Sequence, residues 1–288
     1  MLIASLGFSI MGGAAKTLTG VFNAGQLVFF RNLFGFIFLM IGFAKNRPVN
    51  KGGKFHLLLF RGIIGTIALY CLLYCILNMP LGTAISYNLT SAIFIALFSF
   101  LLFREFNGIL VMLALLLGFT GMLLIYKPHM DLSWQYHLAG LISGMASAIA
   151  YLTVGRLTRY YDARIIVLSF LVAGILLPVI SFLLYHVVGM QQDGLFVIAW
   201  KWPQGWEWAQ VLLLALAALF GQYFVTRAYA ADRAGIVSAV SYVNILFSIF
   251  IGVLLGDAFP DPYSWLGIFL IVTSGIFISF YKSRSSSV

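Results

Sequence analysis

The sequence predicts an all-α integral membrane protein with ten transmembrane helices, arranged as two inverted five-helix repeats. Three observations predict this fold: the composition, the apolar segments and a likeness between the two halves. Of the 288 residues, 62% are hydrophobic and 9% are charged, whereas soluble domains average roughly 45–50% apolar and about 25% charged residues. A soluble chain needs a polar surface that this composition cannot supply, so lipid is the solvent that fits it.

The apolar segments are long enough to cross a bilayer, whose hydrocarbon core requires roughly 20 residues of helix. The predicted spans are 2–20, 26–44, 56–77, 82–103, 108–126, 137–155, 164–188, 208–230, 235–255 and 263–281. Strands of a membrane barrel would alternate apolar and polar residues. These segments are apolar all round, so helices are expected.

The basic residues predict the orientation. With a cytoplasmic N-terminus, twelve of the seventeen basic residues lie on the cytoplasmic side, and only Lys127 and Lys201 fall in outer loops. The twelve are Lys45, Arg47, Lys51, Lys54, Arg61, Arg104, Arg156, Arg159, Arg164, Arg233, Lys282 and Arg284. Since Lys and Arg collect in cytoplasmic loops, both termini are predicted to be cytoplasmic, in the inner (plasma) membrane of a bacterium. The net charge of +9 is then loop charge and not a surface for nucleic acid.

The tryptophans agree with this orientation. All six map to the outer side, and indole rings favour the boundary between membrane and water.

The two halves resemble one another when the first is shifted by 152 positions. Residues 82–86 (GTAIS) then lie over residues 234–238 (AGIVS). Because each half holds five spans, the second half enters the membrane from the opposite side. Inverted repeats of this kind are typical of secondary transporters, whose substrate path lies between the halves near the midplane. We therefore predict one repeat at 1–127 and a second at 137–281.

Short motifs occur in the same order as in a known family. They are Gly12-Gly13-Ala14-Ala15-Lys16 with Phe30-Arg31-Asn32, Thr83-Ala84 with Phe103-Arg104-Glu105, Ala228-Tyr229-Ala230 with Ser241-Tyr242 and Gly256-Asp257, and Leu266-Gly267 with Thr273-Ser274-Gly275. Over nearly its whole length the chain resembles the drug/metabolite transporter superfamily, specifically its EamA-type members with ten spans. The proline often found midway along the family's fourth and ninth spans is missing, and Ala92 and Val243 or Asn244 stand near those places. The resemblance implies a carrier of a small metabolite.

Three basic residues in or near the spans are candidates for binding a substrate, because an ionisable group inside a bilayer is costly. Arg31 is predicted inside the second span and Lys16 near the outer end of the first, so the two could share one level. Arg227 lies about one turn from the inner end of the eighth span. The alternative for Lys16 and Arg227 is snorkelling to the interface, and for Arg31 it is pairing with backbone carbonyls. The hypothesis is that Arg31, with Lys16, binds a carboxylate or similar anion.

Neutral polar residues at helical spacing predict the lining of a cavity. Buried hydroxyl and amide groups need partners in lipid, which could be each other or a substrate. The candidates are Tyr70, Tyr74, Tyr87, Ser91, Gln222, Thr226, Ser238, Tyr242 and Asn244.

Acidic residues are absent from the middle of every predicted span. Glu105, Asp162, Asp232 and Asp257 lie at span ends or in loops. Because proton-coupled carriers usually rely on a membrane carboxylate, facilitated diffusion or exchange is favoured. The predicted function is a secondary transporter that moves a small organic metabolite, such as an amino acid or a related compound with a carboxylate, by alternating access.

The alternatives are a proton-coupled exporter of drugs or metabolites, a membrane-embedded enzyme and a channel. An enzyme would be marked by a motif such as HExxH, and a channel by a ring of pore-lining charges. No catalytic residue, metal site or cofactor is predicted. The expected partners are the solute and membrane lipid, with no nucleic acid, and the protein could act as a monomer or a homodimer.

Overall fold

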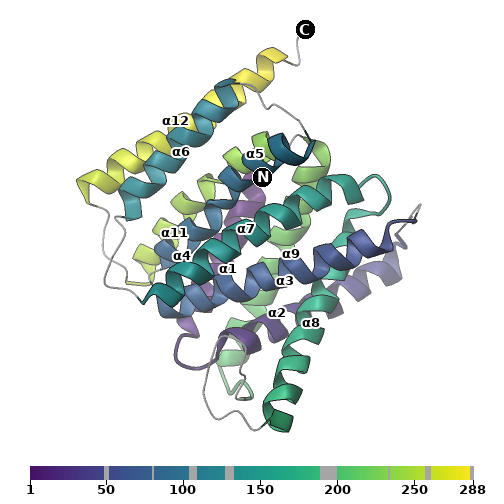
Figure 1. Cartoon of the computed structure of the whole chain (residues 1–288). Coiled ribbons are helices and arrows are strands. Elements are labelled where there is room, and N and C mark those ends of the chain that lie inside the picture. Colours follow the sequence, from purple (N-terminus) through teal and green to yellow (C-terminus); the bar gives the residue numbers. More distant parts are fainter. Residues whose placement is uncertain are drawn as a thin grey trace.

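The computed structural model describes residues 1–48, 52–79, 81–103, 109–126, 133–188, 200–232, 234–256 and 261–285. In these ranges every regular element is an α-helix (Figure 1). The helices are α1 (Leu2–Thr17), α2 (Ala24–Lys45), α3 (Phe55–Asn78), α4 (Leu81–Leu89), α5 (Ser91–Phe103), α6 (Ile109–Tyr126), α7 (Trp134–Leu157), α8 (Ala163–Val188), α9 (Glu207–Ala231), α10 (Ala234–Val240), α11 (Val243–Leu254) and α12 (Pro262–Ser285).

Every predicted span is occupied by helix, and the bounds differ by only a few residues. Two spans, 82–103 and 235–255, were expected as continuous helices, but each contains two. The first breaks at Thr90, between α4 and α5, and the second at Ser241 and Tyr242, between α10 and α11. No proline stands at either break, so the usual marker of an interrupted helix is missing from the sequence.

Hydroxyl side chains accompany both breaks. The Thr90 hydroxyl donates to the Tyr87 carbonyl at 2.6 Å, and the Ser241 hydroxyl donates to the Ser238 carbonyl. A hydroxyl that bonds a carbonyl of the preceding turn competes with the helical ladder and often bends the helix. Polar side chains, and not proline, therefore mark these two bends.

Within the described residues, six helical segments are long and apolar enough to cross a membrane. They are Ala24–Lys45, Phe55–Asn78, Trp134–Leu157, Ala163–Leu184, Glu207–Ala231 and Ile236–Leu254. Four further apolar segments are shorter: Leu2–Thr17, Ala84–Ile95, Met112–Gly121 and Trp265–Ser274. Large apolar side chains such as Leu116, Leu176 and Phe250 are exposed on the outer faces, as expected for helices in lipid.

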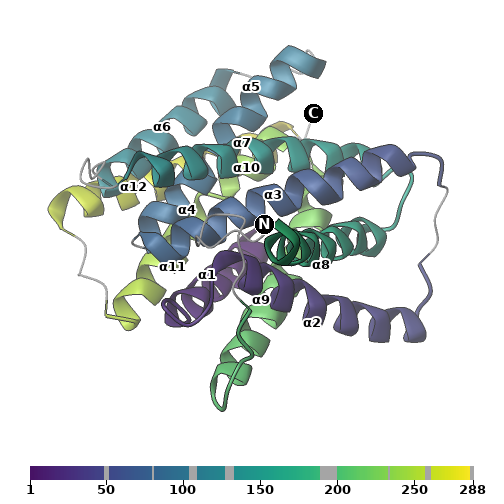
Figure 2. The same cartoon turned by 60° about the horizontal axis from the view of Figure 1, so that its bottom comes forward.

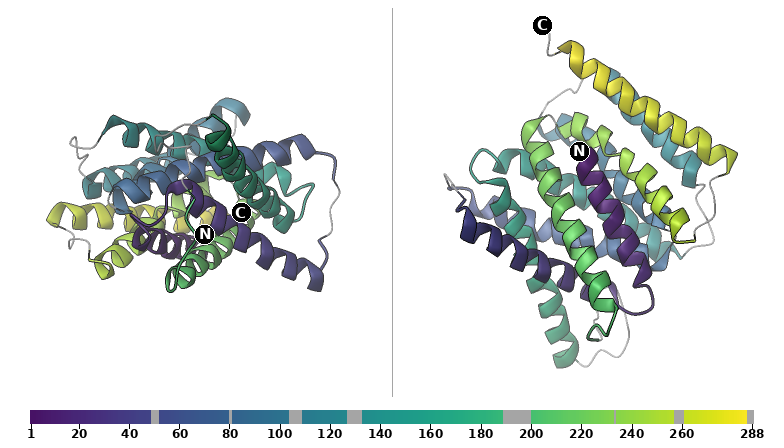
Figure 3. Two further views of the ribbon diagram at one scale, coloured as in Figure 1. Left: turned by 90° about the horizontal axis from the view of Figure 1, so that it is seen from below. Right: turned by 180° about the vertical axis from the view of Figure 1, so that it is seen from behind.

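Helices that are distant in the sequence lie side by side. α1 packs along α9, as the right-hand view of Figure 3 shows, and α3 packs along α7. Small residues make the first contact possible: a Cβ atom added at Gly7 would lie 3.0 Å from backbone atoms of Ala217 and Gly221. Close packing of membrane helices depends on such small residues.

The bundle has two distinct edges. α6 and α12 form a pair at one edge, whereas α2 and α8 lie at the opposite edge (Figures 1 and 2). A Cβ atom added at Gly121 of α6 would lie 2.6 Å from the Gly267 carbonyl oxygen of α12, so the pair is tightly packed. The helices between the two edges enclose the centre of the protein.

Candidate functional site

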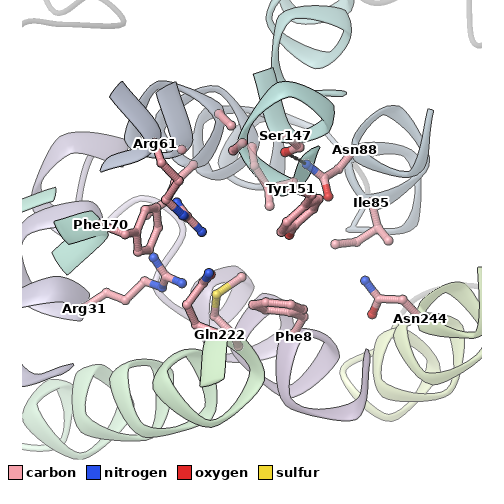
Figure 4. A pocket seen from close by; sticks show the side chains of 16 residues that line it. Phe8, Arg31, Arg61, Ile85, Asn88, Ser147, Tyr151, Phe170, Gln222 and Asn244 are labelled. Atoms are coloured by element: carbon pink, nitrogen blue, oxygen red, sulfur yellow. Dashed lines mark hydrogen bonds between the residues drawn. The ribbon is translucent and has the colours of Figure 1, made fainter. Parts of the chain in front are cut away.

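A cavity lies at the centre of the bundle, where helices from both halves of the chain converge (Figure 4). Its polar and aromatic lining includes Phe8, Arg31, Arg61, Asn88, Ser147, Tyr151, Phe170, Gln222 and Asn244. About 60 Å³ of the space can hold the centres of water-sized molecules, whereas one buried water needs roughly 10–15 Å³. The cavity is therefore large enough for several waters or one small polar group.

Two arginines form one end of this cavity. Arg31 of α2 and Arg61 of α3 are 3% and 1% exposed. Their guanidinium carbons lie 5.1 and 4.9 Å from the centre of the Phe170 ring, so one aromatic ring of α8 contacts both cations. Stacking of this kind attracts a cation to a ring but supplies no counter-charge.

The arginines have few protein partners. Among the described residues, Nε and Nη1 of both Arg31 and Arg61 find no hydrogen-bond acceptor, and Nε2 of Gln222 is equally unpartnered. None of the described side chains that line the cavity is acidic. We call Arg31, Arg61 and Gln222 the cationic pole; its unpartnered atoms are all donors.

Gly65 makes room for one of these guanidinium groups. A Cβ atom at this position, one turn after Arg61 in α3, would lie 2.2 Å from Arg61 Nη1 and 3.0 Å from the Phe170 ring. The Arg61 side chain therefore follows its own helix across the space that any larger residue would fill.

The other end of the cavity is neutral. Asn88 of α4 donates from Nδ2 to the hydroxyl oxygens of Ser143 and Ser147, both at 3.0 Å. Asn244 of α11 accepts at Oδ1 from the Ser9 hydroxyl at 2.5 Å. Figure 4 shows these two amides across the cavity from the arginines. We call Asn88 and Asn244 the amide pole.

Tyr151 separates the cavity from a second hollow. It lines both spaces, and its ring stacks on Tyr229 of α9 with 4.8 Å between centres and 12° between planes. The second hollow has about 480 Å³ of space and is lined by Arg156, Arg159 and Asp232 among others. We call Tyr151 and Tyr229 the tyrosine stack.

Three of the twelve predicted binding residues line the cavity: Arg31, Gln222 and Asn244. Several others instead bond within the protein. The Thr226 hydroxyl donates to the Gln222 carbonyl at 2.8 Å, and the Tyr242 hydroxyl donates to the Leu115 carbonyl at 3.5 Å. These bonds match the alternative that buried polar groups satisfy each other.

The remaining neutral candidates also lie outside this lining. Tyr87 bonds through its hydroxyl to His137 Nδ1, and Tyr74 packs on the Tyr136 ring with 5.5 Å between centres. Tyr70, Ser91 and Ser238 are buried elsewhere among the helices. As binding residues they stay predictions.

Lys16 and Arg227 do not join Arg31. Lys16 Nζ donates to the Met79 carbonyl at 3.0 Å, because the last carbonyls of α3 attract a cation. Lys16 is thus held at the end of α3 and does not line the cavity with Arg31. Arg227 is exposed, with its guanidinium carbon 5.9 Å from the centre of the Tyr223 ring, which fits the snorkelling alternative.

The sequence analysis missed several lining residues. Arg61 was assigned to the cytoplasmic side, yet it is buried in the cavity, since it stands more than one turn inside α3. The position of Arg61 inside an apolar segment could have predicted its burial. The spacing of Ser147 and Tyr151, four residues apart in one apolar segment, could have predicted that they share a polar face. Phe170 carried no signal, because it looks like any core phenylalanine.

Other residues that the sequence singled out lie outside the described residues. They are Lys51, Arg104, Glu105, Lys127, Arg233 and Asp257.

Comparisons with known proteins add to this geometry. Residues 1–127 match the EamA-like transporter family. An uncharacterized transporter of Helicobacter pylori is 29% identical over 283 residues, which cover 97% of this chain and 93% of that protein. The pseudopaline exporter CntI of Pseudomonas aeruginosa is 29% identical, with 96% and 94% covered. The riboflavin transporter of Rhizobium johnstonii is 26% identical, with 96% and 89% covered.

A solved crystal structure resembles the whole chain. It has a TM-score of 0.76 at 17% sequence identity and covers 97% of this chain and 96% of its own. At this identity the likeness shows the fold alone. The relatives are named as transporters and not as enzymes. The chain is therefore a multi-pass membrane transporter, similar over nearly its whole length to proteins named as transporters and over residues 1–127 to the EamA-like transporter family.

Proposed function

We propose that this protein is a secondary transporter for a small organic metabolite with an anionic group, such as a carboxylate, in the plasma membrane of a bacterium. The observation that carries the proposal is the cationic pole. It presents two buried guanidinium groups to a cavity whose described lining has no acidic side chain. Relatives that are named as an exporter of pseudopaline and a transporter of riboflavin support an organic solute.

Charge favours an anionic cargo. Burying a charge without a counter-ion costs several kcal/mol, so the cationic pole is stabilised by any anion that reaches it. Arginine binds planar carboxylates through two parallel hydrogen bonds, and Nε and Nη1 of both arginines lack protein acceptors among the described residues. A cationic drug would be repelled at the same place.

The lining also bears on energy coupling. Proton-driven carriers use a membrane carboxylate that binds and releases the proton, and the residues that line the cavity include none. This favours facilitated diffusion or exchange over proton coupling for the described part of the site.

The proposed architecture is ten spans in two inverted repeats. We count α4 with α5, and α10 with α11, as two spans that are each broken once. The shift of 152 residues carries the break at Thr90 onto Tyr242, and carries 55–78 onto 207–230, nearly the bounds of α9. α1 and α7 are the first helices of the two repeats, and α3 and α9 are the third. α1 packs on α9 and α7 packs on α3, so the first helix of each repeat contacts the third helix of the other, as expected for two related halves. Broken helices at a repeat interface are typical of transporter sites.

The proposed orientation has cytoplasmic termini. Arg164 Nη1 donates to the Asn46 carbonyl at 2.7 Å, so the basic α2–α3 connection and the α7–α8 turn lie at one end of the bundle. Gln26 Nε2 donates to the Lys201 carbonyl at 2.7 Å beside the exposed Trp202 and Trp206. Basic residues favour the cytoplasm and indoles the interface, so we assign the basic end to the cytoplasm.

Alternating access requires a barrier on each side of the site. The tyrosine stack lies between the cavity and the hollow that Arg156 and Arg159 line. We assign it as the cytoplasmic barrier of the described state. Its separation would join the two spaces.

Uptake by proteoliposomes tests the proposal. Purified protein is reconstituted and offered labelled carboxylates, nucleosides and amines, with and without a pH gradient. Saturable flux of carboxylates is expected, with a loss of about 30-fold or more in Arg31→Gln, from the roughly 2–5 kcal/mol of a buried charged contact. Arg227→Gln removes an exposed arginine and should leave the flux unchanged.

Three outcomes would count against the proposal. Transport of amines but not of carboxylates would overturn the anionic cargo. Flux that requires a pH gradient would overturn the uncoupled mechanism. Currents that do not saturate would indicate a channel.

A further inference from the structure

The hydrogen bonds of the amide pole determine which atom of Asn88 faces the cavity. The Ser143 hydroxyl donates its single hydrogen to the Ala68 carbonyl at 3.0 Å. Toward Asn88 the Ser143 oxygen can therefore only accept, and the NH₂ group of the amide must face it. The second amide hydrogen goes to Ser147 at 3.0 Å. Both donors of Asn88 are thus used within the protein, and its carbonyl oxygen Oδ1 is left to a ligand.

Asn244 has the opposite polarity. The Ser9 hydroxyl lies 3.0 Å from both the Asn244 backbone carbonyl and the Ser248 hydroxyl, but its shortest contact, 2.5 Å, is to Asn244 Oδ1. We assign its single hydrogen to that oxygen, which leaves the NH₂ group of Asn244 to the cavity. In Figure 4 the nitrogen of Asn244 points into the cavity, and the oxygen of Asn88 points away from Ser147. The amide pole thus combines one acceptor from α4 with one donor from α11.

The wall around these two amides is largely apolar. Phe8 and Ile85 line the cavity and lie beside the two amides in Figure 4. A polar atom in such a wall loses a water partner when a ligand arrives, and an apolar ligand group leaves it unpaired. The wall therefore favours a ligand that pairs with both amides.

From these contacts we propose that the transporter selects anions that carry an uncharged group with both a donor and an acceptor, such as a carboxamide, opposite the anionic group. A carboxamide would donate N–H to Asn88 Oδ1 and accept at its carbonyl from Asn244 Nδ2. In the described state the cavity has room for one small polar group, so a substrate of this class reaches both the cationic pole and the amide pole only when the tyrosine stack has separated and the two spaces have joined. The inference rests on the proposed function, because the cationic pole anchors the anionic end.

Three carboxylates of equal size test the inference on the unmodified protein. Succinamate has a carboxamide, levulinate has a ketone that can only accept, and isocaproate has an apolar branch. Titration calorimetry on the purified transporter should rank them in this order, with about tenfold weaker binding for each hydrogen bond lost. Equal affinities for the three compounds would overturn the inference.

A variant assigns the effect to the amide pole. Asn88→Leu removes the acceptor at similar size and should weaken succinamate about tenfold while isocaproate is unchanged. Asn88 also bonds Ser143 and Ser147, so Asn88→Leu could fold poorly, and Asn244→Leu then serves as the second variant. Asn244→Leu should weaken the binding of both succinamate and levulinate. An unchanged affinity for succinamate in a folded variant would contradict the role of the amide that was replaced.

The same binding measurements also distinguish a failure of this inference from a failure of the proposed function. If all three carboxylates bind equally and lose affinity in Arg61→Gln, the amide pole does not select but the anion site stands. If no carboxylate binds the unmodified protein, the anion site itself is wrong.

Discussion

The basic residues of the bundle fall into two regions that differ in how their charge is met. At the helix ends, Lys16 bonds the Met79 carbonyl and Arg164 pairs with Asp162 at 3.0 Å. At the centre, Arg31 and Arg61 contact the Phe170 ring and leave Nε and Nη1 without acceptors among the described residues. A basic side chain at a helix end therefore stabilises the fold through an acceptor that the protein supplies. A basic side chain at the centre has no such acceptor and is available to bind a ligand.

Arg61→Met should have the largest effect on transport of the variants considered. It removes a buried cation without a counter-charge, and replacing buried charges by apolar side chains of similar volume is often stabilising by about 1–4 kcal/mol. We expect a higher melting temperature together with a loss of carboxylate uptake of at least about 30-fold. Thermal unfolding and proteoliposome flux measure the two effects. A variant that is both less stable and still active would show that Arg61 is structural, like Lys16.

Gly65→Ala tests the position of the same charge without removing it. The added methyl group would lie 2.2 Å from Arg61 Nη1, so the guanidinium group must move. Uptake should fall by about tenfold, as expected when a charged hydrogen bond of about 1.5–3 kcal/mol is partly lost. Gly42→Ala is the matched control, because nothing lies within 4 Å of its added Cβ atom. Equal losses in both variants would indicate a general effect of alanine in these helices.

Tyr229→Ala should open the central region toward the basic end. An aromatic pair contributes about 0.5–1.5 kcal/mol, so the cavity should become roughly 2- to 10-fold more accessible. A cysteine introduced by Ser147→Cys, after Cys71 and Cys75 are replaced by alanine, reports access through its labelling rate with an impermeant thiol reagent. Tyr229→Phe keeps the stacked ring and should label at the original rate. No increase in Tyr229→Ala would refute the barrier.

The helices were predictable because each is a long apolar segment, and Arg31 was predictable because a charge inside such a segment is costly. The rest of the site depends on which helices meet. Phe170 becomes a partner of two cations only because α8 packs against α2 and α3. Asn88 gains its role from the bonds of Ser143 and Ser147 in α7, and no spacing within α4 indicates which of its amide atoms will be left free.

The same dependence on packing explains the errors over basic residues. Distance from a span end assigned Arg61 to the cytoplasmic side, and a shared hairpin suggested one level for Lys16 and Arg31. Neither rule counts the acceptors nearby. The carbonyl at the end of α3 captures Lys16, whereas α3 continues for more than four turns beyond Arg61 and has no free carbonyl there to offer.

Asp162→Asn probes the helix-end region and should have the smallest effect. Hydrogen bonds from Arg164 hold the pKa of the Asp162 carboxyl below its ordinary value. A carboxyl whose pKa is lower in the folded state stabilises the protein above its unfolded pKa of about 3.9, and this contribution is lost as the pH falls through the folded pKa. Because the two side chains are 27% and 24% exposed, the pair is worth about 0–1 kcal/mol.

The variant should therefore melt slightly lower than the unmodified protein at pH 7, by a difference that shrinks in high salt and below about pH 4. Carboxylate uptake should not change, because neither partner of this ion pair lines the cavity. If Asp162→Asn instead reduced uptake as strongly as Arg61→Met, a partnered charge at the helix end would be acting on the substrate, and the division between the two regions would fail.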